Sequence, residues 1–218
     1  MRLSSSWPRR LRRVQTAGST SAGGSSGQTT SDAGSPAVRR GEGDHGAVLA
    51  HGAAFDAASW EKRAVAIADQ GAGVIAIENI DPDAIRAAVE QLQGEGVADV
   101  AHVGASAGAD AVLDLASQEP GPADQLIRLA PNAIVEGLGE EPKVVVDSVD
   151  EAVAQVSTDL PESSAGGENL VVILPGSAHA QIIFYTDQAP PVLEAMLQRL
   201  ELFASPRVRR FSVHGAMR

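Results

Sequence analysis

Ser106 is the residue in this sequence best suited to chemistry. It stands at the centre of the run Gly104-Ala105-Ser106-Ala107-Gly108, with an apolar stretch before it and a helix-like pattern after it. This layout pushes a serine hydroxyl out of the top of a parallel sheet, through a turn so sharp that the residues two positions away must be very small. Gly104 and Gly108 meet that need, so we predict that Ser106 is a nucleophile.

The same spacing also occurs in a segment that cannot support this chemistry. Gly23-Gly24-Ser25-Ser26-Gly27 fits the pattern G-x-S-x-G, but it lies in a Ser-, Gly- and Thr-rich stretch without a strand pattern before it or a helix pattern after it. Context therefore selects Ser106.

A serine hydroxyl needs two partners before it can attack a substrate. A neutral imidazole must take its proton and later return it to the leaving group, and a carboxylate must fix the imidazole tautomer and stabilise its positive form. The candidates for these roles each follow the end of a predicted strand, and they are His51, Asp147, Asp150 and His179. His102 lies inside a strand, where we expect a hydrogen-bonded core histidine.

Apolar runs and helical patterns alternate along the chain, which predicts an α/β fold with a mostly parallel sheet covered by helices on both faces. The six predicted strands are residues 46–50, 74–77, 97–103, 125–130, 143–146 and 170–174, and the predicted helices cover 56–70, 81–94, 107–117, 151–157 and 190–200. Sheets of this kind place their sites at the carboxyl ends of the strands. The fold should therefore gather the candidate residues at one edge.

Four turns, in this order, resemble those of the α/β-hydrolase superfamily, nearest its small cap-less esterases and dienelactone-hydrolase-like members. They are the turn Ala50–Phe55, the turn Gly104–Gly108, the acid turn Val146–Asp150 and the segment Leu174–His179. The resemblance covers about residues 46–200, and the order Ser, Asp, His is the superfamily's. Residues 1–45 cannot supply its first two strands, and the loop after Ile77 runs directly into a helix. The implied fold is a truncated, six-stranded version.

The resemblance implies a catalytic triad. Ser106 would attack the substrate, His179 would carry the proton, and Asp150 would orient the imidazole. Asp147 is the alternative acid, because strand ends are uncertain from sequence.

The resemblance also implies an oxyanion hole made by the backbone N–H groups of Ala53 and Ala107. Small residues at both positions leave room for a substrate carbonyl. His51 belongs to the same turn as Ala53 and would be structural.

The predicted site is open. Only residues 131–142 separate the fourth and fifth strands, too few for a helical cap, and the aromatic content of 3% offers little for a large acyl pocket. These features favour a serine hydrolase acting on small soluble carboxylic esters, thioesters or lactones. We expect no cofactor and no metal, because no paired histidine or carboxylate cluster has the spacing of metal ligands.

A second hypothesis is a non-catalytic ligand-binding or regulatory protein of the same fold, motivated by the missing strands and the altered loop after Ile77. A nucleotide-binding domain ranks below both, because neither G-x-x-x-x-G-K-[ST] nor G-x-G-x-x-G follows a strand.

Composition divides the 218 residues into three parts. Residues 1–45 are dominated by Ser, Gly, Thr and Arg and lack apolar periodicity, which predicts a disordered or spurious N-terminal extension. Residues 46–204 form the α/β domain, and residues 205–218 form a basic tail.

The predicted domain is strongly acidic. Residues 46–204 hold 25 of the 28 acidic residues but 6 of the 17 Lys and Arg residues, a net charge of −19. Such a surface disfavours nucleic acid and anionic membranes as partners. With no cysteine and no apolar run long enough to cross a membrane, we expect a cytoplasmic protein with a small-molecule substrate. An uncovered strand 46–50 near the sheet edge predicts either a homodimer or cover from N-terminal residues.

Overall fold

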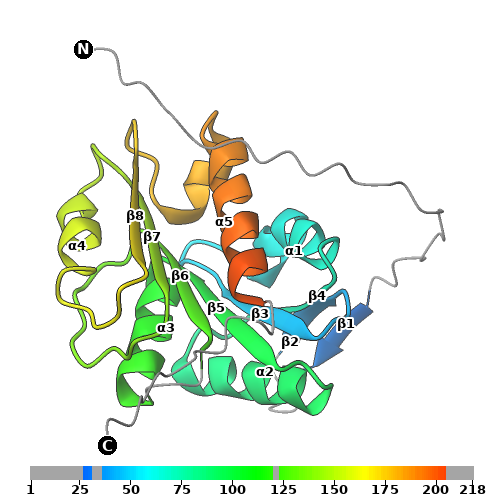
Figure 1. The fold of residues 1–218 in the computed structure, drawn as a ribbon. Coiled ribbons are helices and arrows are strands. Elements are labelled where there is room, and N and C mark those ends of the chain that lie inside the picture. The colour runs from blue at the N-terminus through cyan, green and yellow to red at the C-terminus, as the bar shows by residue number, and fades with distance from the viewer. Residues whose placement is uncertain (1–26, 31–35, 120–122, 205–218) are drawn as a thin grey trace, which may run out of the picture.

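A computed structural model describes residues 27–30, 36–119 and 123–204. The strands are β1 (Gly27–Thr30), β2 (Pro36–Arg40), β3 (His45–Ala50), β4 (Ala72–Ile77), β5 (Asp99–Ala105), β6 (Gln125–Leu129), β7 (Lys143–Ser148) and β8 (Asn169–Leu174). The helices are η1 (Ala57–Trp60), α1 (Glu61–Ala68), α2 (Pro82–Gly94), α3 (Ala107–Gln118), α4 (Ala154–Asp159), η2 (Ala180–Tyr185) and α5 (Ala189–Ala204), of which η1 and η2 are 3₁₀ helices. Figure 1 shows their arrangement around one sheet.

The sheet has eight strands in the order β1-β2-β4-β3-β5-β6-β7-β8. All pairs from β4 to β8 are parallel, whereas β1 pairs antiparallel with β2 and β2 pairs antiparallel with β4. The α/β class with a mostly parallel sheet is confirmed. The count of six strands is wrong, because two further strands lie before residue 46.

The arginines of β2 explain why this strand escapes a search for apolar patterns. Neighbouring residues of a strand point to opposite faces, and each of these two arginines finds an acidic partner. Arg39 pairs with Glu95, just after α2, at 2.7 Å, and Arg40 pairs with Glu61, at the start of α1, at 2.8 Å. Residues that look like part of a charged tail thus anchor a sheet strand to helices distant in sequence.

Strand β3 lies inside the sheet, between β4 and β5. Residues 46–50 were expected near an edge of the sheet, but they pair on both sides. The reason for predicting a homodimer through this strand therefore no longer applies. N-terminal residues do cover an edge, but it is the edge of β4. Residues 1–26 and the predicted tail 205–218 lie outside the described residues.

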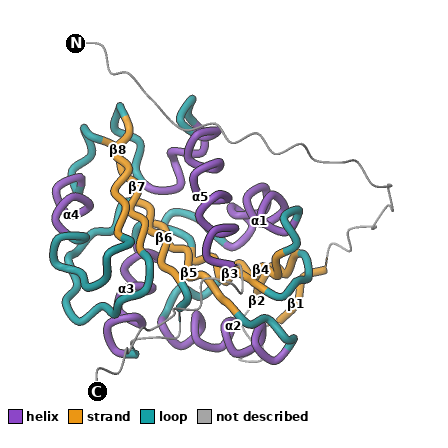
Figure 2. Tube along the Cα trace, in the orientation of Figure 1, coloured by secondary structure: helices purple, strands orange, loops and turns teal. Residues whose placement is uncertain are grey.

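Helices cover both faces of the sheet, as predicted. Helices α1 and α5 lie on one side, and α2 and α3 lie on the other (Figures 1 and 2). One apolar core joins Ile67 of α1 and Met196 of α5 to the sheet, and a second joins Leu92 of α2 and Leu113 of α3 to its other face. Within the described ranges, no helix combines the length and the hydropathy required to cross a bilayer.

The turn between β5 and α3 has the predicted sharpness. Ser106 has a φ of 50° and a ψ of −119°, a conformation that residues other than glycine rarely adopt. A Cβ at Gly104 would lie 2.5 Å from the carbonyl oxygen of Gly108, and one at Gly108 would lie 2.4 Å from that of Ala50. Both glycines are therefore required for α3 to begin so close to β3 and β5.

We expect Gly108→Ala to destabilise the protein by about 1–3 kcal/mol, because the added methyl would overlap backbone atoms that cannot move aside. The matched control is Gly94→Ala, also in a helix, where a Cβ meets no atom within 4 Å. That change should stabilise the protein by about 0.5 kcal/mol. Urea unfolding of both variants tests the pair, and equal stabilities would contradict this account of the turn.

His102, in β5, is fully buried, as expected for a core histidine. The expected hydrogen bonds are absent, because neither ring nitrogen has a partner within the described ranges. Burial lowers the pKa of His102 from 6.5 to about 4. Since the unfolded chain takes up the proton more readily, this residue should make the protein less stable as the pH falls from 6.5 towards 4.

Replacing His102 with leucine should remove this acid sensitivity. Between pH 7 and pH 4.5 the wild type should lose about 2–3 kcal/mol more stability than His102→Leu. Urea unfolding of both proteins at the two pH values gives the difference directly, because all other titrating groups are shared. Identical pH dependence would show that His102 does not have the lowered pKa.

Candidate active site

Ser106 and His179 meet at the carboxyl edge of the sheet. Ser106 lies between β5 and α3, and His179 follows β8 and directly precedes η2. Nε2 of His179 is 2.8 Å from Oγ of Ser106. At this hydrogen-bond distance the imidazole can accept the hydroxyl proton.

The carboxylate beside the imidazole belongs to Glu151. Its Oε1 lies 3.2 Å from Nδ1 of His179, the ring nitrogen that does not face Ser106. Asp150 is exposed, and within the described residues no ion pair or hydrogen bond joins its side chain to His179. Its backbone N–H donates to the carbonyl of Gly176 at 2.9 Å, which fixes the turn so that the next side chain reaches the ring. The structure thus places the carboxylate of Glu151, and not that of the predicted Asp150, beside the imidazole.

Asp147, the alternative acid, is hydrogen-bonded to Ser148 and Ser157. It is fully buried, and it accepts hydrogen bonds from the N–H of Ser148 at 2.7 Å and from Oγ of Ser157 at 2.6 Å. Burial raises the pKa of Asp147, and the two hydrogen bonds oppose this shift. Its carboxylate joins α4 to the end of β7, and within the described residues no hydrogen bond or ion pair joins it to His179.

Of the two backbone amides predicted to form an oxyanion hole, one directly follows Ser106 and the other follows Gly52, whose backbone lies against Ser106. Ala107 is the first residue of α3, and Ala53 follows Gly52, where a Cβ would lie 3.4 Å from Cβ of Ser106. No hydrogen bond leads from either N–H to another described residue. Both amides can therefore donate to an oxygen bound beside Ser106.

His51 is buried and bound to the backbone on both sides of its ring. Nδ1 lies 2.8 Å from the carbonyl oxygen of Gly52, and Nε2 lies 3.0 Å from that of Glu78. These contacts tie the turn after β3 to the end of β4, in agreement with a structural role.

Asn132 is a polar neighbour of the nucleophile that sequence reasoning missed. Its Nδ2 is 3.5 Å from Oγ of Ser106. Asp110, one helical turn after Ser106, accepts from the backbone N–H of Asn132 at 2.8 Å and from its Nδ2 at 2.7 Å. An asparagine directly after a strand end, with an aspartate four residues beyond the serine, was the available signal.

No protein-family model matches the sequence, and a search of curated proteins finds no match. Solved structures do match. Monoacylglycerol lipase from Paleococcus ferrophilus is 13% identical, with a TM-score of 0.67 over 77% of this chain and 98% of that one. A predicted CIB-like hydrolase from Thermoplasma acidophilum is 22% identical, with a TM-score of 0.64 over 83% of this chain and 100% of that one. Dienelactone hydrolase from Anabaena variabilis is 14% identical, with a TM-score of 0.63 over 81% and 95% of the two chains. The protein has the α/β-hydrolase fold.

As in a cap-less α/β-hydrolase fold, the segment between β6 and β7 contains no helix. Large apolar side chains are exposed in the segments that follow the strands, and they are Ile134 after β6, Val149 after β7, and Ile182 and Tyr185 in η2. The Tyr185 ring stacks on that of Phe55 with their centroids 6.5 Å apart. The segments that carry the candidate residues thus also expose apolar side chains.

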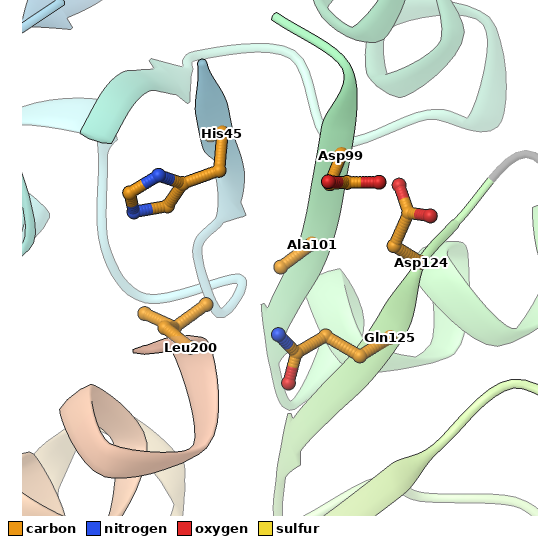
Figure 3. Close-up of a pocket in the computed structure, with 7 residues that line it drawn as sticks. His45, Asp99, Ala101, Asp124, Gln125 and Leu200 are labelled. Atoms are coloured by element: carbon orange, nitrogen blue, oxygen red, sulfur yellow. The ribbon is translucent and has the colours of Figure 1, made fainter. Parts of the chain in front are cut away.

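A small pocket lies at the opposite edge of the α/β-hydrolase sheet, where β3, β5 and β6 begin (Figure 3). It is lined by His45, Gly46, Asp99, Ala101, Asp124, Gln125 and Leu200, none of which is a candidate catalytic residue. Across the described residues, no three His, Asp or Glu side chains are grouped closely enough to hold a metal ion.

Proposed function

We propose that this protein is a serine hydrolase that cleaves small carboxylic esters, thioesters or lactones by acyl transfer. The observation that carries the proposal is the 2.8 Å contact between Nε2 of His179 and Oγ of Ser106. A serine held in a strained turn at hydrogen-bond distance from an imidazole is the arrangement that nucleophilic catalysis requires.

In the first half of the reaction, Oγ of Ser106 attacks the substrate carbonyl carbon while Nε2 of His179 takes the hydroxyl proton. The N–H groups of Ala53 and Ala107 bind the negative oxygen of the tetrahedral intermediate. When the intermediate collapses, His179 gives its proton to the leaving alcohol or thiol, and the acyl group remains on Ser106.

In the second half, His179 takes a proton from water, and the resulting hydroxide attacks the acyl carbon. Collapse of the second intermediate returns the proton to Ser106 and releases the acid. The carboxylate of Glu151 stabilises the imidazolium by its charge, and its contact with Nδ1 orients the ring. The triad of the proposal is Ser106, His179 and Glu151.

The shape of this edge of the sheet supports the proposed substrate class. Without a helical cap the site is accessible, and the exposed Ile182 and Tyr185 offer apolar contact to an acyl or alcohol group. Ester- or lactone-cleaving enzymes among the structural neighbours agree with this class.

The non-catalytic alternative was motivated by the missing N-terminal strands and by the altered loop after Ile77. Strands β1 and β2 remove the first reason, whereas the short connection from Ile77 to α2 remains. We place the acyl-transfer proposal ahead of the ligand-binding one because of the contact between His179 and Ser106.

The proposal is tested by hydrolysis of p-nitrophenyl acetate by the wild type and by Ser106→Ala, at low and at molar salt because the domain is acidic. We expect the wild type to turn over and the variant to lose at least about 1,000-fold in kcat. A fluorophosphonate should label the wild type only. A wild type that is neither active nor labelled at any salt concentration would overturn the proposal.

The acid is tested by comparing Glu151→Gln with Asp150→Asn, which are adjacent changes that each remove one charge. Glu151→Gln should lower kcat by about 100-fold or more, because the imidazolium loses its counter-charge and its fixed tautomer. Asp150→Asn should stay within about 3-fold of the wild type. The reverse order of effects would restore Asp150 as the acid.

A further inference from the structure

We propose that Gln181 is a positioning residue that holds the oxyanion loop, residues 51–56, in register with the catalytic histidine. The inference rests on the proposed serine hydrolase function. Gln181 lies in η2, two residues after His179, and is 2% exposed. Its side chain crosses from the histidine loop to the oxyanion loop.

Both ends of the Gln181 amide are used. Oε1 accepts a hydrogen bond from the backbone N–H of Gly52 at 2.8 Å, and Nε2 donates to Oγ of Ser59 at 2.7 Å. The N–H of Gly52 can only donate, so it requires an acceptor at that point. The hydroxyl of Ser59 donates in turn a hydrogen bond to the carbonyl of Asp56, so the chain of hydrogen bonds spans the loop from Gly52 to Asp56.

A small displacement of the Gly52 backbone would shift the proposed oxyanion hole relative to Ser106. Its backbone lies against the nucleophile, since a Cβ there would be 3.4 Å from Cβ of Ser106 and 3.5 Å from the carbonyl oxygen of Ala105. The next residue, Ala53, supplies the proposed oxyanion N–H. Because such a donor works only at about 2.7–3.1 Å from the oxyanion, whatever fixes Gly52 also fixes the oxyanion hole.

The direction of Gln181 is itself fixed by the backbone. Ala180 has a φ of 50°, and the N–H of Ile182 donates to the carbonyl of His179 at 2.9 Å. The side chain of Gln181 thereby points towards Gly52, at the end of β3. The base and the oxyanion hole, which come from opposite ends of the chain, are connected through this one amide.

A positioning role predicts a loss in kcat more than in KM, because the oxyanion forms only after the substrate has bound. Gln181→Met keeps the length of the side chain but not its polar ends. We expect it to lower kcat by about 10- to 100-fold, with KM within about 3-fold of the wild type. Gln198→Met is the control, because this exposed glutamine of α5 donates to Glu194 on its own helix, and the change should leave both constants unchanged.

The pH dependence of kcat in Gln181→Glu distinguishes a positioning role from a simple loss of packing. A protonated carboxyl has an acceptor and a donor in the places of the amide, whereas the ionised form cannot donate to Ser59 and sets a negative charge near the developing oxyanion. The kcat of Gln181→Glu relative to the wild type should therefore rise as the pH falls, while the ratio for Gln181→Met stays flat. Taking the ratio removes the titration of His179, which is shared.

The outcomes separate the two proposals. If the wild type is neither labelled by a fluorophosphonate nor active, the serine hydrolase function fails. If the wild type is labelled and active, but the folded Gln181 variants match it in kcat or differ only in KM, the positioning role is wrong. Should Gln181→Met fail to fold, Ser59→Ala decides, because it removes the hydrogen bonds of the Ser59 hydroxyl to Gln181 and Asp56 and leaves the bond between Gln181 and Gly52 in place. An unchanged kcat in Ser59→Ala, with no pH dependence in Gln181→Glu, would likewise overturn the role.

Discussion

The structure depends on the close approach of the first turn of α3 to the carboxyl ends of β3 and β5. That approach requires glycine at positions 104 and 108, because a methyl group at either would overlap backbone atoms at 2.4–2.5 Å. Ser106 takes a φ of 50° in consequence, and its N–H is satisfied by the carbonyl of Leu129 at 2.9 Å. Strain at one residue is thus balanced by packing and hydrogen bonding around it.

The loops around Ser106 hold one another in place. Ser148, at the end of β7, donates to the carbonyl of Ala178 at 2.8 Å, so the acid turn supports the histidine loop. Gln181 then joins that loop to Gly52, beside the nucleophile. Parallel strands bring these segments to one edge, but specific hydrogen bonds between loops determine how their side chains meet.

Local patterns were enough to single out Ser106 and His179, which the structure brings within hydrogen-bond distance, because a glycine-flanked serine and a histidine after the last strand each follow directly from strand and turn signals. They predicted Asp150, with Asp147 as the alternative, and did not include Glu151, whose carboxylate lies beside the ring of His179. The placement of Glu151 depends on the hydrogen bond from the amide of Asp150 to Gly176, which joins residues far apart in sequence. Strand β2 was missed for a similar reason, since its arginines are stabilised by Glu61 and Glu95, which no local window includes.

The antiparallel pair β1–β2 has a consequence for how the molecule meets its neighbours. The edge of β4 beyond β3 would present six residues of unpaired backbone, but β2 occupies it, and the outermost strand is β1 with four residues. A short outer strand is a poor template for another chain. A chain beginning at residue 46 would present β4 to solvent, and loss of this N-terminal cover would favour aggregation through sheet extension.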